Sequence, residues 1–186
     1  MTNAPITGVT YALIGLTLRL GPTNFLYYHD LVAPATGANN IIVTQSSGGA
    51  LVSCGQSAYG VHQTTPRTDT KYVSGTSTAP SFSAMVSGSD EICLSGVGTN
   101  FTPVDTPDAS WTTDFNGTNP GGDLRVVAQH KIGAASIDRT DSFDVSATWD
   151  IAGIALKAAS GAAPDTVSFR GSFPPAKRAT WPSLTY

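Results

Sequence analysis

The chain has 186 residues, of which 12% are charged and 40% are hydrophobic, and its net charge is -3. This length suits a single domain with one core, and the Lys and Arg residues are too scattered for a surface that binds nucleic-acid phosphates. Because 19 glycines and 12 prolines accompany many Ser and Thr residues, helices are disfavoured and an all-β fold is expected.

The first third of the chain predicts four strands. Residues 1–8 have no periodicity and are expected to form an N-terminal arm, and alternating apolar residues predict strands over 9–20 and 25–32. A short strand over 41–44 leads through a Ser-Ser-Gly-Gly turn into a strand over 50–59. One face of that strand carries small residues, so we expect it in the middle of a two-sheet sandwich, packed against Trp149, Ile151, Ile154 and Leu156.

The middle of the chain predicts three more strands and a long loop. The strands cover residues 71–76, 81–86 and 92–97. Residues 99–122 have no usable period and contain three prolines, so a loop is expected there. Loops of that length in a compact domain are usually functional.

The last third contains the clearest pattern. Alternation predicts a strand over 123–130, then a hairpin of strands 142–149 and 151–158 with Asp150 at the turn. A final strand is expected over 166–169, followed by a proline-broken tail. The prediction is therefore an all-β, two-sheet antiparallel jelly-roll β-sandwich of about ten strands, with an N-terminal arm (1–8), the sandwich domain (9–172) and a C-terminal tail (173–186).

Several motifs occur in an order that resembles a known family. They are Leu26-Tyr27-Tyr28 followed by Pro34-Ala35-Thr36-Gly37, then IIVT (41–44), YGVHQTTP (59–66) and VSATWDIAGIALK (145–157). This order resembles the bacterial and phage β-sandwich domains related in shape to the concanavalin A-like lectins. The resemblance implies a structural or adhesion role in a virion or a secreted protein.

The chain departs from that family in two places. His62 stands where the family more typically has Asp, and only eight residues precede Val9, where the family usually has another apolar strand. Absence of that strand would leave a sheet edge open, and a neighbouring chain could cover it by adding a strand.

The sequence lacks the usual signatures of an enzyme. It has no Gly-x-Ser-x-Gly elbow, and His29, His62 and His130 lie in three separate predicted elements. Its only Glu is Glu91, and the paired carboxylates of lectin-shaped glycosidases are missing. We therefore expect a protein that is not an enzyme.

No cofactor is expected, although two groups of aspartates could supply oxygen ligands to Ca²⁺. The alternative is that these side chains cap turns. The groups are Asp138, Asp141 and Asp144, and Asp105 with Asp108. Cys54 and Cys93 could form a disulfide, but two unbridged thiols are favoured because the start of the sequence has no signal-peptide pattern. No segment reaches the roughly 20 apolar residues of a membrane span.

The favoured function is a structural subunit on the surface of a phage virion, in a decoration, tail or appendage, acting in the virion or an extracellular assembly. Homo-oligomers or other virion proteins are the expected partners, and nucleic acid and membrane are not. The expected assembly contacts are aromatic and apolar residues of the tail, Phe173, Trp181, Leu184 and Tyr186; alternatively, both ends fold back on their own domain.

The alternative function is a lectin-like module that binds carbohydrate through residues 99–122. Exposed aromatic rings stack on sugar rings, and neighbouring amides read the hydroxyl groups. Trp111, Phe115, Asn116 and Asn119 would form that site. Trp111 and Phe115 could instead anchor the loop to the sandwich.

Overall fold

The computed structural model describes residues 12–20, 24–30, 52, 54–62, 64–159 and 165–170. These residues form antiparallel sheets and contain no helix. The expected all-β class is therefore confirmed. The predicted strand at 41–44, the arm (1–8) and the tail (173–186) lie outside the described residues.

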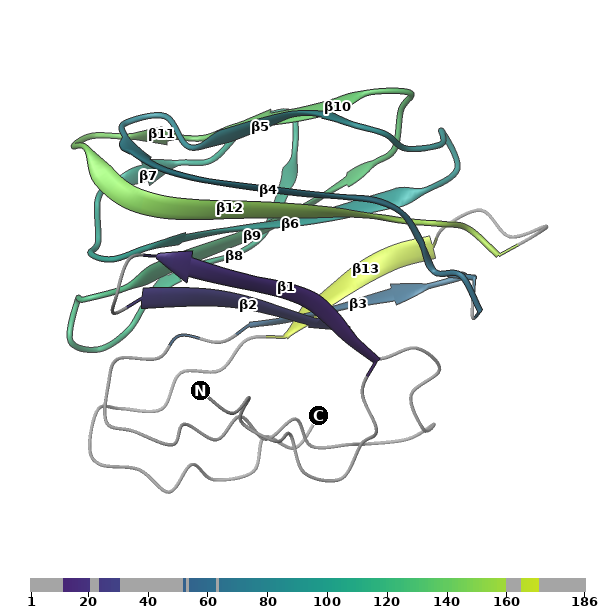
Figure 1. Cartoon of the computed structure of the whole chain (residues 1–186), viewed down its shortest axis with the longest axis horizontal. Coiled ribbons are helices and arrows are strands. Elements are labelled where there is room, and N and C mark those ends of the chain that lie inside the picture. Colours follow the sequence, from purple (N-terminus) through teal and green to yellow (C-terminus); the bar gives the residue numbers. More distant parts are fainter. Residues whose placement is uncertain are drawn as a thin grey trace, which may run out of the picture.

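A five-stranded antiparallel sheet forms the centre of the described structure (Figure 1). Each face of this sheet is covered by shorter two-stranded sheets. The strand order is β4 (Arg67–Ser77), β12 (Ala147–Leu156), β6 (Ile92–Thr99), β9 (Arg125–Ile132) and β8 (Thr112–Thr118).

One face of the central sheet packs against two short sheets that lie above it in Figure 1. These are β5 (Ser81–Met85) with β10 (Ile137–Thr140), and β7 (Asp105–Thr106) with β11 (Ser142–Phe143). Between them lies the first core, which contains Phe82, Met85, Cys93, Val97, Trp111, Ile137, Phe143, Trp149 and Ile151. The sheets therefore pack face to face, as in a β-sandwich.

The opposite face of the central sheet carries a second, smaller core. It consists of Ile92, Leu94, Ile154 and Leu156, against which Ala58 and Val61 pack. Below it in Figure 1 lie the pairs β1 (Ala12–Leu20) with β2 (Asn24–Asp30) and β3 (Gly55–Tyr59) with β13 (Asp165–Arg170).

β12 is the strand around which both cores form. Trp149 and Ile151 point into the first core, whereas Ile154 and Leu156 point into the second. Because both of its faces are buried, the strand is a nearly continuous apolar run rather than an alternating one. The predicted turn at Asp150 was wrong: this residue lies within β12, completely buried, and accepts a 2.9 Å hydrogen bond from Tyr72 Oη.

Two further sequence predictions need correction. The strand predicted over 50–59 as the middle of the sandwich corresponds to β3, which belongs to a two-stranded sheet with β13, because the central position goes to the more apolar β12. The segment 99–122 is not one loop, since it contains β7 and β8. The sequence also failed to predict β10.

Gly153 allows Phe82 to approach β12 closely. A Cβ atom built on Gly153 would lie 2.8 Å from Phe82 Cζ and 3.1 Å from Met85 Sδ. We therefore expect Gly153→Ala to destabilise the protein by about 1–3 kcal/mol through overpacking, measured by urea denaturation. Phe82→Leu in the same chain should recover part of that loss; purely additive effects of the two substitutions would contradict the close approach.

A β-bulge interrupts the pairing of β5 with β10. Met85 pairs with Ile137 and Phe82 with Arg139, so two residues of β5 lie opposite Asp138 alone. Ala84 in the bulge has a φ of 56°, and its N–H donates a 2.8 Å hydrogen bond to Asp138 Oδ1. The carboxylate of Asp138 thus stabilises the bulge.

Ala84→Gly is expected to stabilise the fold by about 0.5–1 kcal/mol. Left-handed backbone costs a residue with a Cβ roughly 1–2 kcal/mol, and the greater freedom of glycine in the unfolded chain offsets part of the gain. Ala84→Val should have the opposite effect. Thermal unfolding of the three proteins tests this, and a lower midpoint for the glycine variant would contradict it.

Candidate functional site

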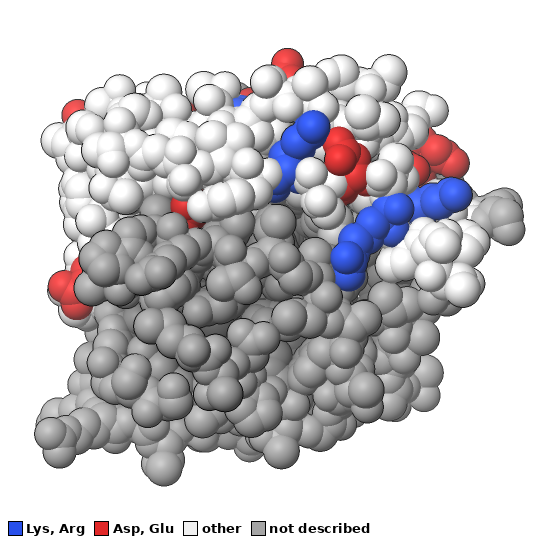
Figure 2. Space-filling model, in the orientation of Figure 1, with Lys and Arg blue, Asp and Glu red and all other residues white. Residues whose placement is uncertain are grey.

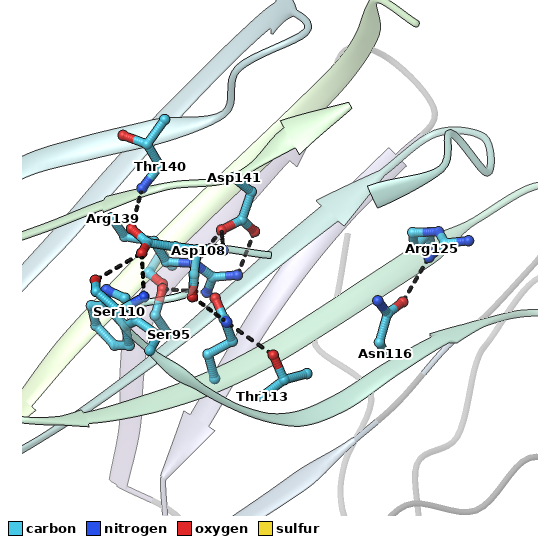
Figure 3. Close-up of polar contacts among 12 residues, drawn as sticks. Ser95, Asp108, Ser110, Thr113, Asn116, Arg125, Arg139, Thr140 and Asp141 are labelled. Atoms are coloured by element: carbon cyan, nitrogen blue, oxygen red, sulfur yellow. Dashed lines mark hydrogen bonds and ion pairs between the residues drawn. The ribbon is translucent and has the colours of Figure 1, made fainter. Parts of the chain in front are cut away.

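The most prominent polar group in the structure is an ion pair inside the first core (Figure 3). Arg139 and Asp141 are both completely buried. Arg139 donates from Nε to Asp141 Oδ1 at 3.0 Å and from Nη2 to Oδ2 at 2.6 Å. Its Nη1 donates to Ser95 Oγ at 2.8 Å, and Ser95 in turn donates to the carbonyl of Ala152 at 2.7 Å. The ion pair therefore links the two packed layers through β6 and β12.

Asp108 extends this network to the surface. Its Oδ1 accepts hydrogen bonds from the N–H and hydroxyl of Ser110, and its Oδ2 accepts one from the N–H of Thr140 (Figure 3). Its own N–H donates to Asp141 Oδ1 at 3.1 Å. Partial burial favours a higher pKa, but the bonds from Ser110 and Thr140 outweigh it and lower the pKa of Asp108. This carboxylate is therefore ionised, and both of its oxygens accept hydrogen bonds from Ser110 and Thr140.

Asp105 differs because neither oxygen of its buried carboxyl group has a hydrogen-bond partner. Desolvation is the main cause that raises its pKa to about 7, and the nearby carboxylate of Asp141 adds to it. Arg139 and Arg125 act in the opposite direction. Near neutral pH this side chain is therefore partly protonated.

Trp111 covers the buried ion pair. Its indole N–H donates to the carbonyl of Asp138 at 3.0 Å, and its ring meets Phe82 edge-on with a centroid separation of 6.1 Å. The guanidinium of Arg139 lies 5.8 Å from the ring centroid and Lys131 Nζ lies 6.0 Å from it. Both cations are within the range of cation–π attraction. Trp111 therefore belongs to the core, as the alternative interpretation of this residue stated.

The other three residues predicted to bind a ligand do not share one surface with Trp111. Phe115 is buried, and Asn119 is buried with its Oδ1 accepting from the N–H groups of Asp123 and Leu124 in a turn. Only Asn116 is exposed, and its Oδ1 accepts a 2.7 Å bond from Arg125 Nη1 (Figure 3). Glycan binding therefore stays a prediction. Of the four residues named for it, only Asn116 has an exposed side chain.

Of the five aspartates predicted as possible Ca²⁺ ligands, Asp108 and Asp105 are described above. Asp138 accepts from Ala84 N–H and Asp144 from Val104 N–H, both at 2.8 Å, while Asp141 pairs with Arg139. Within the described residues, no three His, Cys, Asp or Glu side chains are grouped so that they could bind a metal ion.

Sequence reasoning missed a second polar cluster, which joins β3, β8 and β9. His130 Nδ1 lies 2.8 Å from Asp114 Oδ1 and 2.9 Å from Oδ2. Gln56 Nε2 donates to Asp114 Oδ2 at 2.7 Å and to the carbonyl of Gln129 at 3.3 Å. The three side chains come from distant parts of the sequence, and no local motif marks them.

A carboxylate and the imidazole that it orients are two of the three members of a catalytic triad, and a nucleophile beside the pair would complete it. Cys54 lies close enough to Asp114 to be affected by its charge. Although Cys54 is exposed as a residue, neighbouring atoms desolvate its thiol, and this effect together with Asp114 raises the pKa to about 11. The thiol is therefore protonated at neutral pH and is a poor nucleophile.

The other histidines and the two cysteines were also considered from the sequence. His62 Nδ1 accepts from the N–H of Thr65 at 3.1 Å in a turn, and the side chain of His29 is outside the described part. Cys54 and Cys93 are both free thiols, as favoured from the sequence. Basic and acidic side chains of the described residues are interspersed on the face shown in Figure 2.

Comparison with protein-family models, curated proteins and solved structures gives no match for this chain. Among the described residues, no helix is long and apolar enough to cross a membrane.

Proposed function

We propose that this chain is a non-enzymatic structural subunit of an assembled particle. The observation that carries this proposal is that four of its carboxylates bind main-chain N–H groups. Asp108, Asp138, Asp141 and Asp144 each accept a main-chain N–H from a different segment of the chain. Side chains committed to such contacts stiffen the scaffold and are not free to take part in general acid–base chemistry.

The particle we propose is a phage virion, with this subunit on its surface in a decoration, tail or appendage. Support comes from the order of motifs over residues 27–157, which resembles virion-associated β-sandwich domains, and from the low net charge, which suits a surface that does not bind the genome. We further propose that the packed sheets form a jelly roll. The central sheet favours this because its strand order is far from the chain order.

The proposed assembly contacts lie in the terminal segments. The tail combines Phe173, Trp181, Leu184 and Tyr186 with several prolines. Proline-rich segments with aromatic side chains are suited to binding in extended form on a neighbouring surface. In this proposal the tail of one subunit binds to the next subunit.

Static light scattering and negative-stain microscopy of the full chain test the proposal. We expect particles larger than a dimer, and we expect Trp181→Ala with Tyr186→Ala to shift the chain to smaller species. Lys177→Ala with Arg178→Ala is the matched control in the same tail and should leave the particles intact. A full chain that stays monomeric at millimolar concentration would overturn the proposal.

A further inference from the structure

Residues 102–107 form a strap at one edge of the layer that covers the first core. The strap contains β7, whose only strand partner within the described residues is β11, and that pairing covers two residues of each strand. Val104 N–H donates to Asp144 Oδ1 at 2.8 Å, and Asp144 N–H donates to the carbonyl of Val104 at 3.1 Å. The hydroxyl of Thr102 donates to the carbonyl of Gly122 at 3.3 Å. A segment held by so few bonds opens at a lower free energy than the whole domain.

The chain is anchored on both sides of the strap. Before it, the hydroxyl of Thr99 donates to the carbonyl of Phe101. After it, the N–H of Asp108 donates to Asp141 Oδ1, and the carboxylate of Asp108 accepts the N–H of Thr140. The strap can therefore detach while the residues that flank it stay in place.

Asp105 is the polar side chain that the strap buries against the first core. Val104 and Thr106 on either side of it are exposed, whereas Asp105 is only 9% exposed and lies directly opposite the buried Phe143 in the pairing with β11. Neither oxygen of its carboxyl group has a hydrogen-bond partner. A neutral carboxyl group is tolerated in such a position, but burial of an unpaired carboxylate is very costly.

The charged groups around Asp105 do not compensate for its ionisation. They are Asp141, which opposes a second negative charge, and Arg139 and Arg125, which favour it in that order. Arg139 already forms a bidentate ion pair with Asp141. An ionised Asp105 is therefore a second carboxylate beside a guanidinium whose charge is matched, and water is the remaining source of stabilisation.

We propose that the strap is a pH-sensitive device, in which loss of the proton of Asp105 detaches residues 102–107 from β11 and exposes the first core beside Phe143. The carboxylate then reaches water, which is close because Val104 and Thr106 already contact solvent. Protonation closes the strap again. This device lies in the sandwich and does not depend on the proposed function.

Hydrogen exchange of the full chain, measured by mass spectrometry of peptides that contain the strap, tests the proposal. The pKa of Asp105 is raised from 3.8 to about 7 in the closed structure, mainly by desolvation. Between these values the closed strap binds a proton that the open strap has lost. After correction for the intrinsic exchange rate at each pH, the protection of the Val104 N–H should fall about tenfold per pH unit from about pH 5 to about pH 7, and should level off above that.

Two substitutions of the same kind separate Asp105 from other groups. Asp105→Asn should remove most of the pH dependence of the strap, and any part that comes from Asp144 remains in this variant. Asp150→Asn, at a buried aspartate in β12, is the matched control and should leave the pH dependence of the strap unchanged. Asp105→Ala gives a second variant without a titrating group if the amide disturbs the core.

Peptides from β12 serve as the internal reference for unfolding of the whole domain. We expect the strap to exchange faster than β12 at every pH. Equal protection of the two segments would show that only global unfolding exposes the strap, and would overturn the inference. A strap whose protection does not change with pH, or changes equally in the wild type and Asp105→Asn, would overturn it as well. Particle formation tests the proposed function separately, so either proposal can fail alone.

Discussion

Arg139→Met is expected to lower the free energy of unfolding by about 3–5 kcal/mol. The substitution leaves the completely buried carboxylate of Asp141 without its bidentate partner and removes a hydrogen bond to Ser95. An unpaired charge in that position is far more costly than a buried pair. Urea denaturation followed by tryptophan fluorescence measures the loss, because Trp111 lies beside Arg139.

Two variants control this experiment. Arg125→Met makes the same change at a partly exposed arginine and should cost less than about 1 kcal/mol. Arg139→Met combined with Asp141→Leu removes both charges and should recover much of the stability, although the N–H of Asp108 then loses its acceptor. A cost below about 1 kcal/mol for Arg139→Met alone would show that the ion pair does not stabilise the first core.

Asp105→Asn is expected to make the protein more stable above pH 7, by on the order of 2–4 kcal/mol. The pKa of Asp105 is raised from 3.8 to about 7, chiefly by desolvation and then by Asp141. Between these two values the folded chain binds a proton that the unfolded chain has lost. Stability from this group is therefore complete below about pH 4 and is lost as the pH rises toward about 7.

Unfolding measured from about pH 4 to about pH 8 tests this expectation. The wild type should lose stability across the range, and Asp105→Asn should show a weaker decline. Some decline should remain, because burial also raises the pKa of Asp150 to about 6. Asp150→Asn is the matched control that isolates this second contribution. Equal pH profiles for the wild type and Asp105→Asn would show that Asp105 is not the group responsible.

The sequence predicted several strands close to the bounds that the structure gives them. The strands expected over 81–86, 92–97 and 123–130 correspond to β5, β6 and β9. β10 was missed because Arg139 takes an inward position that an apolar residue would normally occupy, which hides the alternation. β8 was missed because Phe115 is its only buried residue.

The polar clusters could not be predicted from the sequence. Arg139 and Asp141 are two residues apart, which by itself indicates only that they share a face of a strand. Their burial depends on Ser95 and Trp111, which come from other parts of the chain. Asp114 and His130 meet because β8 and β9 pair, and Gln56 reaches them from β3. Such contacts follow from the pairing of distant segments, for which short-range periodicity contains no signal.

The strand order of the central sheet has a consequence for synthesis of the chain. β12 pairs with β4 on one side, as in Ala147 with Ser77, and with β6 on the other, as in Trp149 with Thr99. Neither neighbour can complete its hydrogen bonds until Leu156 has left the ribosome, so folding of the sheet must wait for most of the chain. Contacts between such distant residues slow folding, and the nascent polypeptide is exposed to aggregation during that delay.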